Sequence, residues 1–164
     1  MNSTLYRYGL ILLSLLLLSA CGFAPRGSYL LDEKLQQIYI SSSDEFSPLV
    51  RELKRQLAQN NVEVFEYAQE GVPTLNLGTE QINKRTLSLF ENGQVAEYEL
   101  SYRVGGYLQV ANQGNFPVQV RLHRDFQDNP LAALAKQRER ELLYNELRTM
   151  AADQIMRQLA TVSW

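Results

Sequence analysis

Side chains suited to acid–base chemistry lie in two short segments. The only histidine, His123, stands two residues from Asp125, and Glu97 stands two residues from Glu99. A His/Asp pair with a serine is the basis of many hydrolases, and paired carboxylates serve glycosidases. However, no pattern places a nucleophile beside His123, and two carboxylates on one strand face are usually just solvated charge. The sequence also lacks a His/Cys metal cluster and a glycine-rich phosphate loop, so we expect no catalysis, no metal and no other cofactor.

The single cysteine, Cys21, predicts a different chemistry. An apolar run over residues 9–18 leads into the sequence Ser-Ala-Cys-Gly at 19–22. This is the pattern of a bacterial lipobox, whose cysteine thiol takes up a diacylglycerol thioether before a peptidase cleaves the chain in front of it. The apolar run is about half of the roughly 20 residues that span a membrane. We therefore interpret residues 1–20 as a cleaved signal peptide and Cys21 as the lipidation site.

The residue after the cysteine bears on where the protein is located, and the net charge bears on which partners it can bind. Gly22 is not the aspartate that commonly retains lipoproteins at the inner membrane, so we expect an acylated (palmitate-bearing) protein anchored on the periplasmic side of the outer membrane. The formal net charge is −2, and cleavage would remove Arg7 and no acidic residue. Such a chain is not expected to bind nucleic acid. Lipidation of Cys21 also leaves no thiol for a disulfide.

The segment after the anchor predicts a tether over residues 21–30 and one domain over 31–164. Residues 35–40 and 62–67 favour strands, and they flank a helix that Ser47 and Pro48 begin and that a leucine spacing of four makes amphipathic. A longer strand over residues 75–90 loses its alternation near Gly78, which suggests a bulge.

The second half of the domain predicts a hairpin, a further strand and a long helix. Asn92-Gly93 favours a type I′ turn with two positive φ angles, and residues 98–110 and 116–126 alternate cleanly, with Pro117 typical of an edge strand. About thirty residues after Pro130 predict a helix with an apolar stripe. The predicted fold class is α+β: a two-layer sandwich with two helices on one face of a mostly antiparallel sheet of about four strands.

Several segments, in order and behind the lipobox, resemble the LptE family of lipopolysaccharide-assembly lipoproteins. The resemblance covers nearly the whole chain after the signal peptide and is carried by Cys21-Gly22-Phe23 with Arg26, by residues 48–51, 56–57 and 61–63, by residues 72–78, by Phe90-Glu91-Asn92-Gly93-Gln94-Val95-Ala96-Glu97-Tyr98, and by residues 128–136.

This resemblance implies a non-enzymatic plug seated in the lumen of the large outer-membrane β-barrel of the LptD family, in a complex expected to be 1:1. The protein would help the barrel assemble and would receive lipopolysaccharide. The hairpin over residues 87–98 matches the family segment that projects against the barrel, with Leu89, Phe90, Asn92 and Gly93 as its contacts. The alternative is that Leu89 and Phe90 pack on their own sheet.

Lipopolysaccharide binding in the family is attributed to basic side chains. Lys136, near the start of the long helix, matches that motif. The sequence departs from the pattern at Glu91, where some relatives carry a basic residue and where a carboxylate repels phosphate. The missing charge could come from four other cations: Lys84, Arg85, Arg103 and Arg121.

Two other functions remain open from the sequence. A free-standing periplasmic lipid carrier or chaperone lipoprotein would use the same anchor and the same cations, and it predicts a closed apolar cavity. A hydrolase built on His123 rests on a single residue pair.

Overall fold

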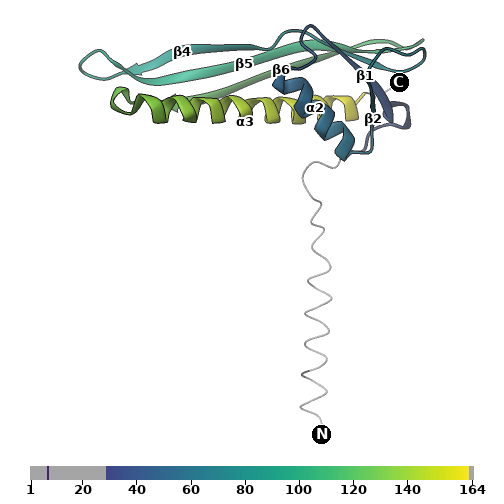
Figure 1. The fold of residues 1–164 in the computed structure, drawn as a ribbon, viewed down its shortest axis with the longest axis horizontal. Coiled ribbons are helices and arrows are strands. Elements are labelled where there is room, and N and C mark those ends of the chain that lie inside the picture. The colour runs from purple at the N-terminus through teal and green to yellow at the C-terminus, as the bar shows by residue number, and fades with distance from the viewer. Residues whose placement is uncertain (1–6, 8–28, 163–164) are drawn as a thin grey trace.

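The computed structural model describes Arg7 and residues 29–162 (Figure 1). Cys21, the lipobox and most of the predicted tether lie outside the described residues, so signal peptide, lipidation and domain boundaries stay predictions. Tyr29, at the end of the predicted tether, contacts the folded domain. Its backbone N–H donates to Asn60 Oδ1 at 2.7 Å, and its hydroxyl hydrogen-bonds to Asp153 on the long helix.

One sheet of six strands forms the first layer, where about four strands were predicted. Strands β2, β1, β3 and β5 are neighbours in that order. Strand β4 pairs with the same edge of β5 as β3 does, and β6 pairs with the opposite edge. The β1 strand is parallel to β2 and β3, and the remaining pairings are antiparallel. The strands are β1 (Gln37–Ser42), β2 (Glu63–Phe65), β3 (Thr74–Leu77), β4 (Gln81–Leu89), β5 (Val95–Val110) and β6 (Gly114–Gln127).

The predicted strand over residues 75–90 is divided into β3 and β4, which accounts for one of the extra strands. Both pieces pair with the same edge of β5, β3 with Gly106–Gln109 and β4 with Val95–Arg103. Between them Gly78 donates its N–H to the Gly105 carbonyl at 2.8 Å. A Cβ on Gly106 would lie 2.0 Å from the Asn76 carbonyl oxygen, so this close approach of β3 to β5 requires glycine.

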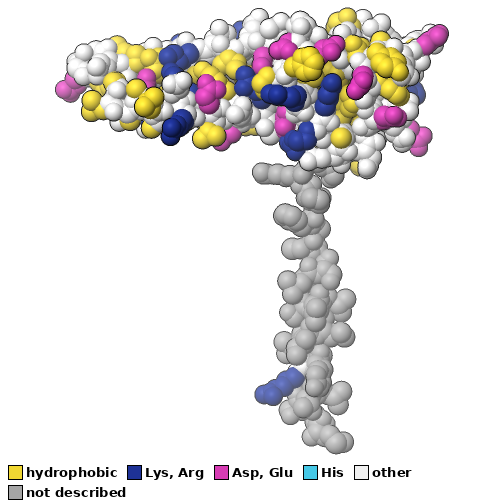
Figure 2. Space-filling view, in the orientation of Figure 1, with side chains coloured by type: hydrophobic (Ala, Val, Ile, Leu, Met, Phe, Trp, Pro, Cys, Tyr) yellow, Lys and Arg dark blue, Asp and Glu magenta, His cyan; other side chains and the backbone are white. Residues whose placement is uncertain are grey.

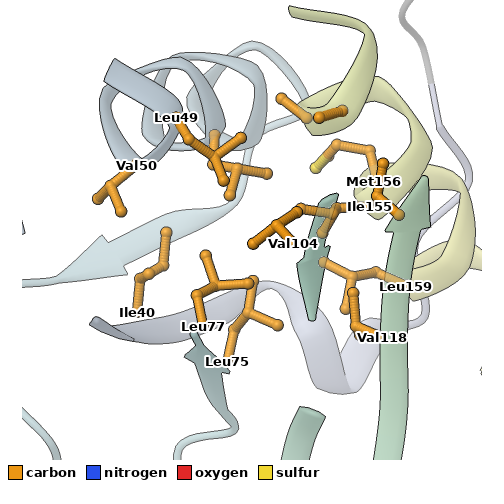
Figure 3. Close-up of a cluster of buried hydrophobic side chains, with 14 of the residues drawn as sticks. Ile40, Leu49, Val50, Leu75, Leu77, Val104, Val118, Ile155, Met156 and Leu159 are labelled. Atoms are coloured by element: carbon orange, nitrogen blue, oxygen red, sulfur yellow. The ribbon is translucent and has the colours of Figure 1, made fainter. Parts of the chain in front are cut away.

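Both helices lie on one face of the sheet, as predicted (Figure 1). Even-numbered residues of β5 and β6 turn toward them, and the core contains Leu100, Tyr102, Val104, Val118 and Val120. Figure 3 shows sheet residues such as Leu75, Leu77 and Val104 meeting Leu49 and Ile155 from the helices. Odd-numbered residues occupy the opposite face, which no described helix covers.

The shorter of the two α-helices on the sheet, α2 (Pro48–Gln59), follows the predicted local signals. The Ser47 hydroxyl accepts a hydrogen bond from the Val50 N–H at 3.2 Å, and Pro48 takes the first helical position, where no N–H is needed. Leu49, Leu53 and Leu57 are buried, because a spacing of four keeps them on one face.

The long helix, α3 (Ala133–Ala160), follows a short 3-10 helix, η2 (Pro130–Ala132). Asn129 caps η2 by accepting from the Leu131 N–H at 3.0 Å. The fully buried residues of α3 all fall in its second half: Leu147, Ala151, Ala152, Ile155, Met156 and Leu159. The predicted apolar stripe is therefore confirmed, but it anchors only half of the helix.

The outer edge of β6 has no neighbouring strand among the described residues. At one point the Gln158 side chain of α3 takes the place of a strand: it accepts from the Gln119 N–H at 3.1 Å and donates to the Gln119 carbonyl at 2.7 Å. Pro117 lies two residues away on this edge strand, as its sequence position predicted.

Candidate functional site

The five cations considered from the sequence are divided between the two faces of the sheet. Lys84 pairs in register with Leu100, whose side chain is buried, so Lys84 lies on the face that carries the helices. Arg85 pairs with Glu99 on the opposite face, and Arg103 and Arg121 pair with each other there. Lys84 is thus the only one of these four that shares a face with α3 and Lys136.

Lys84 and Lys136 each approach an aromatic ring. Lys84 Nζ lies 3.9 Å from the centroid of the Tyr98 ring, and Lys136 Nζ lies 5.1 Å from that of Phe126. Tyr98 and Phe126 are directly paired residues of β5 and β6. The two ammonium groups therefore sit over two neighbouring rings, in cation–π contacts that favour a charged lysine. We call these four residues the lysine–aromatic site.

Position in the fold explains how segments so far apart in sequence meet at this site. Lys84 is supplied by the middle of β4, Tyr98 by the start of β5 and Phe126 by the end of β6. The Asp128 N–H donates to the Ala96 carbonyl at 2.8 Å, which holds the end of β6 against β5. The chain then turns through η2 and brings Lys136 back over the sheet.

Lys136 has a second neighbour, because its ammonium donates to Glu139 Oε2 at 2.8 Å. The Lys136 side chain is 21% exposed and the Glu139 side chain 48%. A carboxylate that exposed holds the lysine weakly, since surface ion pairs contribute about 0–1 kcal/mol. The lysine–aromatic site can therefore exchange Glu139 for an anionic ligand.

The β4–β5 hairpin forms at the predicted place, but with a different turn. The Gly93 N–H donates to the Phe90 carbonyl at 2.9 Å, and the Phe90 N–H donates to the Gln94 carbonyl at 2.7 Å. Only Gly93, at φ +80°, has a positive φ in this loop, so the predicted type I′ turn, which needs two, is wrong. Asn92 instead uses its side chain to accept from the Gln94 N–H at 3.0 Å.

Large apolar side chains are exposed at the hairpin end of the molecule, which Figure 1 shows to be the end where α3 begins. Leu89 is 59% exposed and Phe90 46%, so neither packs fully on its own sheet. Leu131 in η2 and Leu134 and Leu142 in the first half of α3 are also exposed. In Figure 2 apolar side chains also reach the surface at this end. We call the hairpin tip and the start of α3 the distal end.

Glu91, in the hairpin loop, is exposed and does not join the lysine–aromatic site through any hydrogen bond or ion pair that the described residues form. Tyr98 and Phe126 were not considered as site residues from the sequence. Their signal was the alternation that placed both on the buried face, but the pairing of one with the other is set by strand register.

A mostly buried ion pair fixes the middle of α3 to the sheet. Arg148 Nε lies 3.1 Å from Glu80 Oε2, and the Tyr102 hydroxyl donates to the same oxygen at 3.0 Å. Tyr102 has no exposed surface, and burial, followed by the nearby Glu80 charge, raises the pKa of its hydroxyl far above the usual range. Tyr102 therefore stays a neutral donor to Glu80.

The residues considered for catalysis lie on the open face of the sheet. Ser101 stands directly opposite His123, yet no hydrogen bond joins them; the near neighbour of the His123 ring is Glu99, at 3.8 Å from Nδ1. Asp125 pairs with Glu99, and Glu97 accepts from the Ser88 hydroxyl at 2.8 Å. Within the described part of the chain no cluster of His, Cys, Asp or Glu could hold a metal ion.

No described helix combines the length and apolar character needed to cross a membrane.

Comparisons with known proteins agree with the fold and the motifs. The model of the family described as "LptE: Lipopolysaccharide-assembly" matches residues 35–159. The LPS-assembly lipoprotein LptE of Photorhabdus laumondii is 39% identical over 150 residues, which cover 92% of this chain and 82% of that protein.

Two solved structures show the same arrangement. The rare lipoprotein B of Shewanella oneidensis has a TM-score of 0.70 and 41% identity, covering 76% of this chain and 94% of its own. A lipoprotein B of Nitrosomonas europaea has a TM-score of 0.67 and 28% identity, covering 85% and 90%. On this evidence the chain belongs to the LptE family of lipopolysaccharide-assembly proteins.

Proposed function

We propose that this protein is an outer-membrane lipoprotein that plugs and helps assemble a β-barrel of the LptD type, and that it binds lipopolysaccharide during insertion into the outer leaflet. Family membership supports lipopolysaccharide assembly, and the relatives are named as lipoproteins. Cys21 would carry the lipid anchor on the periplasmic side. The protein acts by binding, and no catalytic step is assigned to it.

The observation that carries the binding role is the lysine–aromatic site. Two ammonium groups over neighbouring rings offer positive charge beside apolar surface. Lipopolysaccharide presents phosphates next to acyl chains, so its chemistry matches both parts. Lys136 and Lys84 bind phosphate in this proposal, whereas Arg85, Arg103 and Arg121 cannot join them because the sheet lies between.

The observation that carries the docking role is the exposed apolar surface of the distal end. Leu89 and Phe90 stand out from the hairpin whose turn Asn92 and Gly93 form. Exposed apolar groups gathered at one end of a protein mark an interaction surface. In our proposal these four residues contact the barrel wall from inside the lumen.

The alternative of a free-standing lipid carrier requires an enclosed apolar cavity. One hollow of about 510 Å³ is open to solvent and is lined mainly by polar residues, among them Glu33, Lys34 and Gln37. A second, between β1 and α2, has a volume of only about 60 Å³. A third, of about 340 Å³, is lined partly by Leu30, Leu31 and Val62, but it is also open to solvent. None of the three is the enclosed apolar cavity that a lipid tail needs, so the geometry favours the plug.

The test is an affinity purification of the full-length protein from detergent-solubilised outer membranes, with bound proteins identified by mass spectrometry. We expect one large barrel at near one-to-one stoichiometry, with lipopolysaccharide present. Recovery of lipopolysaccharide without a barrel would support the carrier, and recovery of neither would refute the proposed function.

A further inference from the structure

The open face of the sheet holds two arginines that stand directly opposite each other. Arg103 of β5 pairs in register with Arg121 of β6. The pair two residues along the strands is Gly105 and Gln119. The Gly105 carbonyl accepts from Gly78, on the side away from β6, and the Gln119 N–H donates to Gln158, so these two residues are not hydrogen-bonded to each other. Since backbone direction alternates, Arg103 and Arg121 also form a non-hydrogen-bonded pair, the kind whose side chains lie closest, with Cα atoms about 4.5 Å apart.

No carboxylate neutralises this pair. Gln81 of β4 completes the row beside Arg103, and the next row consists of Asn83, Ser101 and His123. Neither arginine forms an ion pair within the described part of the chain. The nearest acid along β5, Glu99, is already engaged by Arg85 at 3.2 Å. Like charges placed directly opposite on a sheet are destabilising.

The surroundings add hydrogen-bonding groups and an aromatic ring. Gly105, beside Arg103 on this face, has no side chain, and beyond it Tyr107 is 40% exposed. Gln119, opposite Gly105, is also exposed. Amide side chains next to an exposed ring can bind a sugar, because the amides bond to hydroxyl groups while the ring covers a sugar face.

We propose that Arg103 and Arg121 form a second anion site, which binds a phosphate carried on a saccharide. The inference rests on the proposed lipopolysaccharide binding for its choice of ligand, and it adds a site on the opposite side of the sheet from Lys84 and Lys136. A phosphate accepts paired hydrogen bonds from guanidinium groups and removes the repulsion between them. The two sites lie on opposite faces of the sheet and act independently: the lysine–aromatic site binds the phosphates of the lipid end, and the arginine pair binds phosphorylated sugars.

The test uses the full-length protein in detergent and a lipid-free probe: the phosphorylated core oligosaccharide released from lipopolysaccharide by mild acid. We expect saturable binding at low salt that falls at least about tenfold in Arg103→Gln/Arg121→Gln. The same loss is expected when the oligosaccharide is dephosphorylated. The thermal midpoint of the double variant should be unchanged or raised, because a like-charge pair has been removed.

A matched control removes two exposed cations elsewhere, Arg51→Gln/Lys54→Gln on α2, and should bind the oligosaccharide as the unmodified protein does. Equal loss in this control would show a general charge effect and overturn the site. Full binding by the arginine double variant would also overturn the site, and so would equal binding of the dephosphorylated oligosaccharide. Inorganic phosphate that binds as tightly as the oligosaccharide would overturn the saccharide assignment and identify free phosphate as the ligand.

Intact lipopolysaccharide separates the two proposals. Suppose that intact lipopolysaccharide binds, that Lys136→Glu weakens this binding, and that the oligosaccharide alone does not bind. The arginine site is then refuted and the proposed function stands. If neither intact lipopolysaccharide nor the oligosaccharide binds, both fail.

Discussion

Lys136 contacts both an aromatic ring and a carboxylate, whereas Lys84 contacts an aromatic ring and forms no ion pair with the residues that the structure describes. A phosphate that enters the lysine–aromatic site must compete with Glu139 for Lys136. That competition is mild, since Glu139 is half exposed and forms a surface ion pair. Lys84 needs no exchange of partners. The two lysines should therefore act on one ligand with unequal contributions.

The first prediction concerns the coupling of these lysines. Lys136→Glu should weaken lipopolysaccharide binding at low salt by about tenfold or more, because a charge-assisted hydrogen bond contributes roughly 1.5–3 kcal/mol. Lys84→Gln should weaken binding less, because it removes one positive charge whereas Lys136→Glu reverses one. The double variant should lose less than the sum of both, since both lysines contact one ligand. Titration of the full-length variants would measure this. Arg138→Glu, an exposed site on the same helix, is the control, and unchanged affinity in Lys136→Glu would refute the role.

The sequence predicted part of this arrangement. Clean alternation in β5 and β6 separates Tyr98 and Phe126 from Arg103 and Arg121, and the structure confirms that separation. It could not sort Lys84 from Arg85, because adjacent strand residues face opposite ways and β4 has no clear alternation. Only its pairing with β5 decides which of the two joins Lys136.

At the scale of elements, the turn of the β4–β5 hairpin requires one residue with a positive φ angle, which Gly93 provides. Asn92-Gly93 was correctly predicted to make a hairpin, but the three-residue loop places only Gly93 at positive φ. Register shifts in β4 around Ser88 accompany this turn. Turn type depends on loop length, which depends on where pairing stops, and a local sequence signal does not contain that information.

The second prediction is that Phe90→Asp reduces barrel docking. A carboxylate in place of an exposed ring removes apolar contact and adds a charge that must be desolvated in the interface. The measurement is the yield of barrel that co-purifies with the full-length variant. Phe46→Asp, at another exposed phenylalanine in the loop before α2, should leave the yield unchanged. An unaltered yield for Phe90→Asp would place the interface elsewhere.

The third prediction concerns the clamp between α3 and the sheet. Arg148→Ala should lower the free energy of unfolding by about 1–3 kcal/mol, because Glu80 loses a charged partner at a site where both side chains are mostly buried. Urea unfolding of the full-length protein would measure it. Glu80→Gln/Arg148→Met should recover part of the loss, since replacing both charges leaves none unpaired. A single variant as stable as the unmodified protein would show that the clamp contributes nothing.

Buried side chains are distributed unequally along the length of the molecule. The core lies where α2 and the second half of α3 cover the sheet, and the distal end carries exposed leucines and Phe90 (Figures 1 and 2). The sequence indicated two helices and one sheet, and both are confirmed. The predicted number of strands, about four, was too low, because the loss of alternation near Gly78 was interpreted as a bulge within one strand, whereas it marks the break between β3 and β4.

The fourth prediction follows from this gradient. In the unassembled protein, amide hydrogens of α3 residues 133–146 should exchange faster than those of residues 147–160, because only the second half is anchored by buried side chains. Binding to the barrel should slow exchange in the first half. Hydrogen exchange read by mass spectrometry would test this, and uniform protection along α3 in the free protein would contradict it.

The contact of Gln158 with Gln119 also bears on how the protein behaves before it meets a partner. The outer edge of a 14-residue strand such as β6, which pairs on one side only, is a template for edge-to-edge polymerisation. The Gln158 amide already occupies both backbone groups of Gln119, and Pro117 offers no N–H. An incoming strand is left with a short stretch bordered by the charged groups of Arg121 and Asp125. A copy that awaits assembly is thereby protected against aggregation along the outer edge of β6, the longer of the edge strands β4 and β6 among the described residues.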